Sequence, residues 1–99
     1  MNTQDVLTEQ DLNRLAAHTD GAALTTNKMV EELTRSAAAV LLWKRKPNFK
    51  TRNDMLQAIA KLNVIQSQFV MIASDDAITG IERYQKLVYE QLKRKITKK

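Results

Sequence analysis

Hydrophobic residues recur every three or four positions along most of the chain, which is the spacing of one face of an α-helix. The clearest early set is Met29, Val30, Leu33, Ala37, Val40 and Leu41. This set predicts a helix that begins near Thr26 or Asn27 and ends at Lys46, because Pro47 lacks the amide proton needed to continue it. We expect these apolar residues to form its inner face.

A shorter helix is predicted before it, from Glu9 to Asp20. Thr8 and Asp11 have the spacing of a capping box, in which each side chain accepts a backbone N–H of the other residue. Asp20-Gly21 is a plausible stop. Its expected apolar face is formed by Leu12, Leu15 and Ala16.

The third predicted helix runs from a second capping-box-like start, Thr51 to Asp54, to about Ala73. Its main apolar stripe is Met55, Ala58, Ile59, Leu62, Ile65, Phe69 and Ile72. A second set falls on the opposite side: Ala60, Val64, Ser67 and Met71. A helix with apolar residues all round is normally buried on more than one side. We therefore predict that this second set forms a protein interface.

A fourth helix is predicted after Ser74-Asp75-Asp76, whose side chains can cap it, with Thr79 as an alternative start one turn later. Its expected inner face is Ile81, Tyr84, Val88 and Leu92, with Ile78, Leu87 and Ile96 beside them. Residues 96–99 form a basic tail that we expect to fray.

The predicted fold is all-α, since two glycines and one proline in 99 residues leave few of the turns that an all-β protein needs. Short connections favour antiparallel neighbours, so we expect a small antiparallel helical bundle of three long helices plus a short N-terminal helix. Residues 1–99 are predicted to form a single domain. No transmembrane segment is expected, and the polar, acidic stretch Met1–Gln10 does not resemble a secretory signal, which predicts a cytoplasmic protein.

The predicted bundle gathers ten basic residues at one end. They are Lys44, Arg45, Lys46, Lys50, Arg52, Lys93, Arg94, Lys95, Lys98 and Lys99. The rest of the chain carries six basic residues and all 11 acidic ones. Such a cluster attracts anions more strongly than the net charge of +5 suggests. It predicts contact with nucleic-acid phosphates, DNA or RNA, while compensation of helix C-terminal dipoles or contact with an acidic protein or an anionic membrane remain alternatives.

Two aromatic residues flank the basic stretch 44–48. Trp43 and Phe49 could stack on unpaired bases, or they could pack against the bundle.

Familiar catalytic arrangements are missing from the sequence. There is no cysteine, and His18 is the only histidine. Asp75 and Asp76 are adjacent, so on a helix they point in different directions and suit a capping role better than a shared site. We expect no enzyme activity, no metal and no cofactor. The predicted function is a non-enzymatic helical module that binds nucleic acid with little sequence specificity; the alternative is a protein-interaction or self-assembling module that uses the second apolar set.

Overall fold

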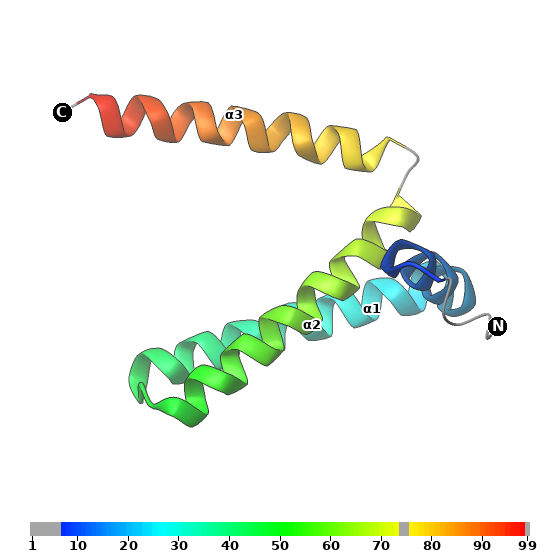
Figure 1. The fold of residues 1–99 in the computed structure, drawn as a ribbon, viewed down its shortest axis with the longest axis horizontal. Helices are drawn as coiled ribbons and strands as arrows, with labels where there is room; N and C mark the ends of the chain where they lie inside the picture. Colours follow the sequence, from blue (N-terminus) through cyan, green and yellow to red (C-terminus); the bar gives the residue numbers. More distant parts are fainter. Residues whose placement is uncertain (1–6, 74–75, 99) are drawn as a thin grey trace.

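The computed structural model describes residues 7–73 and 76–98, which form three α-helices (Figure 1). Helix α1 spans Glu9–Arg45, α2 spans Phe49–Ala73 and α3 spans Ala77–Thr97. Helices α1 and α2 pack against each other as an antiparallel hairpin, as expected for a short connection. The predicted all-α class is therefore confirmed. Of the helices in the described ranges, none combines the length and the apolar character that a membrane span requires.

Helix α1 replaces the two helices that the sequence predicted for residues 9–46. The capping box is confirmed: Asp11 N–H donates to Thr8 Oγ1, and Thr8 N–H donates to Asp11 Oδ2, each over 3.1 Å. The predicted stop at Gly21 is a kink, with φ 78° and ψ 172°, after which helical conformation resumes at once. An ion pair of 2.6 Å between Lys28 Nζ and Asp20 Oδ2 spans this kink. No separate N-terminal helix is present in the described chain.

The start of α2 lies earlier than predicted. Asn48 N–H donates to Thr51 Oγ1 over 3.1 Å, and Thr51 N–H donates to Asn48 Oδ1 over 2.9 Å. Asn48 is thus the cap and Thr51 is the third residue of the helix, whereas the sequence suggested Thr51 as the cap. The main stripe of α2 is correctly predicted, since all seven of its residues are buried or half-buried.

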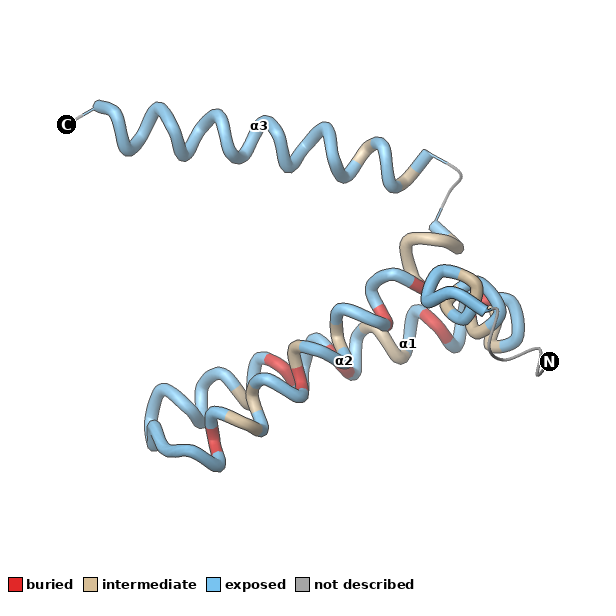
Figure 2. The backbone as a smooth tube through the Cα atoms, in the orientation of Figure 1, coloured by how far each residue is buried: buried red, intermediate tan, exposed pale blue. Residues whose placement is uncertain are grey.

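The face of α1 that packs on α2 is not the apolar one. Its buried residues beyond the kink are Thr25, Glu32 and Ser36, while Val30, Leu33, Val40 and Leu41 are exposed (Figure 2). Only Met29 of the predicted inner face is half-buried. Before the kink, Ala17 is buried, Ala16 is half-buried, and Leu12 and Leu15 are exposed, so only Ala16 of the predicted apolar face is partly covered.

Close approach of the two backbones explains this choice of face. Ser36 and Ala58 are small and buried, and Ser36 Oγ donates to the Ala58 carbonyl over 3.2 Å. A branched side chain at either position would hold the helices apart. On the N-terminal side of the kink, Gln68 Nε2 donates to Asn13 Oδ1 over 3.3 Å. The hairpin is therefore held by small and polar residues together with the apolar stripe of α2.

Helix α3 does not complete a bundle. It contacts α2 but not α1, and it diverges from the hairpin toward the C-terminus (Figure 1). None of its residues is buried, so the expected inner face is not packed in this structure. The helix begins at Ala77, with Asp76 in the cap position and Gly80 N–H donating to the Asp76 carbonyl over 2.9 Å. Of the residues in the predicted cap and tail, Ser74, Asp75 and Lys99 lie outside the described chain.

Candidate interaction surfaces

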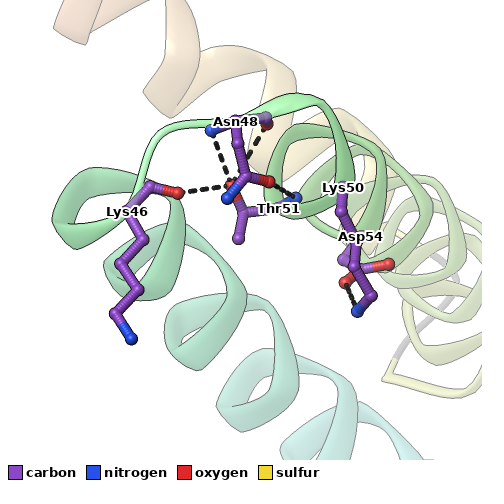
Figure 3. A network of polar contacts seen from close by, with 5 residues as sticks. All are labelled: Lys46, Asn48, Lys50, Thr51 and Asp54. Carbon is purple, nitrogen blue, oxygen red and sulfur yellow. Dashed lines mark hydrogen bonds and ion pairs between the residues drawn. The ribbon is translucent and has the colours of Figure 1, made fainter.

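The turn between α1 and α2 is held by Thr51. Its hydroxyl donates to the Lys46 carbonyl over 2.8 Å and accepts the Asn48 N–H, so one buried side chain joins the end of α1 to the cap of α2 (Figure 3). The side chain of Lys46 extends away from these contacts (Figure 3). The turn therefore presents its charged groups on a fixed backbone.

Five of the predicted phosphate-binding residues lie at this turn: Lys44, Arg45, Lys46, Lys50 and Arg52. Lys50 Nζ pairs with Asp54 Oδ2 over 3.1 Å (Figure 3). The other four have no carboxylate partner within the described part of the chain. Phe49 is 77% exposed and does not pack against the bundle, whereas Trp43 is only 38% exposed, so most of its side chain is covered. The turn thus combines unpaired cations with an uncovered aromatic ring.

The other predicted cations, Lys93, Arg94 and Lys95, lie on the last part of α3. Because α3 diverges from the hairpin, they are carried on a separate arm, and Figure 1 shows the C-terminal end of α3 apart from the α1–α2 turn. The prediction of one basic pole depended on α3 returning along the hairpin. The structure shows two separate basic groups instead.

The two sides of the hairpin differ in chemistry. On one side, Glu32 Oε1 pairs with Arg35 Nη1 at 3.2 Å and with Lys61 Nζ at 3.4 Å. Glu32 is only 4% exposed, and its Oε2 is buried without a hydrogen-bond partner. A pocket on this side is lined by Glu32, Arg35 and Lys61 and also by Asp54 and Gln57. We call this the polar side.

Apolar residues of both helices lie on the opposite side. Each residue turns a helix by about 100°. In an antiparallel pair, residues displaced from the line of contact by the same angle, in the direction of increasing residue number, lie on the same side of the pair. By this geometry the side opposite Glu32 carries residues that are exposed or half-buried: Met29, Leu33, Val40, Met55, Ile59 and Leu62. We call this set the apolar side. Val30, 57% exposed, extends it around α1.

Helix α3 carries a continuous apolar stripe formed by Ile78, Ile81, Tyr84, Val88, Leu92 and Ile96. Every residue of this stripe is exposed. Charged residues of α3, including Arg83, Lys86 and Glu90, lie mostly on the opposite face. The sequence identified this stripe but also placed Leu87 beside it, which lies about 100° from Val88 on the helix, and it assigned the stripe to the inside of a bundle.

The second apolar set of α2 is partly available. Ala60, Val64 and Ser67 are exposed, and Met71 is half-buried. Ser67 and Met71 line an open groove of about 540 Å³ between the start of α1, the end of α2 and the first turns of α3, where Ile78 and Ile81 form the facing wall. The predicted protein interface is therefore divided between this groove and an open surface around Val64.

No grouping of three or more metal-ligating side chains, counting His, Asp and Glu, occurs in residues 7–73 and 76–98. His18 is exposed on α1. Comparison with known protein families, curated proteins and solved structures finds no match to this chain. The assignment of its function therefore rests on its own residues.

Proposed function

We propose that the chain is a non-enzymatic helical interaction module that associates with protein through the stripe of α3 and the apolar side of the hairpin. The observation that carries the proposal is that α3 has a strong apolar stripe and no buried residue. A helix with one apolar and one charged face gains stability mainly by packing the apolar face against another element.

Surface patches support the same function. Single exposed apolar side chains are normal, but large contiguous ones typically mark interaction sites. Here the exposed apolar residues continue along α1 from Val30 to Leu41 and along α3 from Ile78 to Ile96. Both surfaces are long enough to accept a partner helix, which is recognised through residues three and four positions apart.

The test is photo-crosslinking in cells with a crosslinking amino acid at Val88, which lies in the stripe. Leu87 is the matched control because it is similarly exposed but lies about 100° away on the same helix. We expect a discrete protein adduct from position 88 and none from position 87. The absence of any adduct from position 88 and from position 33, on the apolar side of the hairpin, would contradict the proposal.

Nucleic-acid binding is a second candidate, favoured by the exposed Phe49 ring among the unpaired cations of the α1–α2 turn. Aromatic rings beside a basic groove bind single strands by stacking and phosphate contact. The test is a titration of labelled single- and double-stranded DNA and RNA at several salt concentrations. If none of them binds at low salt, this candidate is excluded.

A further inference from the structure

We infer that the partner of the apolar side is α3 of a second copy of this chain, in a reciprocal exchange between two molecules. The inference rests on the proposed function and names its partner. In this arrangement, Ile81, Val88 and Leu92 of one copy lie on the apolar side of the other copy's hairpin. The basic end of that α3 is directed away from the α1–α2 turn of the other copy.

The exposed area of a single chain is too large for an isolated domain. The surface is 8343 Å², whereas a compact protein of 11.3 kDa exposes about 5,700 Å². The radius of gyration is 17.2 Å, against about 13 Å for a compact domain of this length. The excess, about 2,600 Å² per chain, corresponds to roughly 5,000 Å² in a dimer, which is the size of an obligate interface.

The charge distribution opposes closure of α3 on its own hairpin. Only residues 74–76 separate α2 from α3, so closure within one chain must place α3 antiparallel to α2. Lys93, Arg94 and Lys95 would then lie beside the turn that carries Lys44 to Arg52. Like charges brought together in this way repel, and this accounts for the open position of α3 in Figure 1.

The α3 of a second copy is not connected to this hairpin through residues 74–76. It can therefore lie parallel to α2 of the first copy. The cations of α3 then lie toward the open end of the hairpin, which carries Glu9, Asp11 and Asp20. The first half of α3 carries Glu82 together with Arg83 and Lys86 and is not acidic overall. The direction of binding is therefore set by the cationic C-terminal end of α3, which is complementary to the acidic open end of the hairpin.

The lengths of the elements also match. At 1.5 Å per residue, the 21 residues of α3 span about 31 Å and the 25 residues of α2 span about 37 Å. One α3 thus covers most of the apolar side. The polar side stays in water with its ion pairs intact.

The first experiment measures the solution mass of the intact chain. We expect twice the 11.3 kDa of one chain. Val88→Asp is expected to give a monomer, whereas Leu87→Asp keeps the dimer. Leu33→Asp, on the hairpin, is the second disrupting variant, and helix content by circular dichroism shows that each variant is still folded.

The second experiment tests the direction. The chain has no cysteine, so single cysteines can be introduced cleanly. A mass-tagged Ile96→Cys chain is mixed with an Ala22→Cys chain, whose cysteine lies near the open end, or with a Lys44→Cys chain, whose cysteine lies at the turn. We expect a disulfide between the two chains with Ala22→Cys. A disulfide mainly with Lys44→Cys overturns the inference.

The third experiment reverses the charge of α3 with Lys93→Glu, Arg94→Glu and Lys95→Glu. The repulsion that opposes closure within one chain then becomes attraction to the turn. We expect a monomer whose radius of gyration falls toward about 13 Å, measured by X-ray scattering. An unchanged dimer would contradict the role of these charges in the exchange.

The outcomes separate this inference from the proposed function. A monomer at high concentration that still gives a protein adduct in cells at position 88 overturns the exchange but leaves the interaction module standing. A monomer that instead binds vesicles of anionic lipid through α3, with no protein adduct in cells, overturns both.

Discussion

Ser36 on α1 donates a hydrogen bond of 3.2 Å to the main-chain carbonyl of Ala58 on α2, and both residues are buried. A side chain reaches the backbone of a neighbouring helix only where the helices approach closely, and the small size of both residues permits this. The contact explains why α1 presents Thr25, Glu32 and Ser36 to α2 and leaves its leucines and valines outside.

The first prediction concerns this close contact. Ala58→Leu inserts three extra carbon atoms between the helices, and overpacking of this kind costs about 1–3 kcal/mol of unfolding free energy. The measurement is chemical denaturation at a fixed chain concentration. Ala60→Leu is the matched control because Ala60 is exposed on the same helix. Equal stability of the two variants would show that the helices do not approach closely at Ala58.

The second prediction concerns the buried carboxylate of Glu32. Its Oε2 has no hydrogen-bond partner, and its two cationic partners are more than half exposed, so the desolvation of the charge is incompletely offset. We expect Glu32→Leu to raise the unfolding free energy by about 1–4 kcal/mol. Glu31→Leu, at an exposed position, serves as the control in the same denaturation experiment. A loss of stability in Glu32→Leu would show that the ion pairs stabilise the hairpin.

The sequence predicted the features that depend on local chemistry. The capping box of Thr8 and Asp11, the end of α1 before Pro47 and the buried or half-buried apolar stripe of α2 are all present. It did not predict the packed face of α1, because hydrophobicity favours Val30 and Leu33 over Glu32 and Ser36. Nor did it predict the position of α3, because a stripe on a helix shows that a partner is needed but not which chain provides it.

The third prediction concerns the kink at Gly21. Its φ of 78° with ψ of 172° is a conformation open almost only to glycine, and a Cβ there would meet no atom within 4 Å. The cost of Gly21→Ala is therefore backbone strain alone, about 1–3 kcal/mol of unfolding free energy. The hydrogen bond from Gln68 Nε2 to Asn13 Oδ1 reports whether the kink survives, and hydrogen exchange of the Gln68 side-chain amide would measure it.

Gly80→Ala is the control for the kink. Gly80 lies within α3, also with nothing within 4 Å of a Cβ, and its φ is not positive. Alanine there favours the helix by about 1 kcal/mol, so helix content by circular dichroism should rise. If both glycine variants gain stability, Gly21 does not require its observed conformation.

The fourth prediction concerns pH and the start of α1. The N–H of Thr8 donates to Asp11 and, together with the Thr8 hydroxyl and the charge of Arg14, holds the pKa of this carboxyl below its ordinary value. The folded pKa is the lower one, so the stabilisation is fully present above the ordinary pKa of about 3.9 and is lost as the pH falls through the folded pKa. Carbon-13 NMR of the Asp11 carboxyl should show this low midpoint. Thr8→Ala removes the hydroxyl and keeps the N–H, so the midpoint should move up only part of the way, and an unchanged midpoint would show that the hydroxyl does not contribute.

The last prediction separates the two basic groups as phosphate-binding sites. The slope of log affinity against log salt concentration is negative, and each phosphate contact that is lost should make it shallower by about 0.9 for duplex DNA. Replacing Lys44, Arg45 and Lys46 with glutamine should therefore make the slope shallower. Phe49→Ala should weaken binding to single strands much more than to duplex.

Because the structure places Lys93, Arg94 and Lys95 on a separate arm, their replacement with glutamine tests whether one nucleic acid reaches both groups. If the slope changes with the turn variant alone, the turn is the site. If it changes equally with both variants, one nucleic acid contacts both groups.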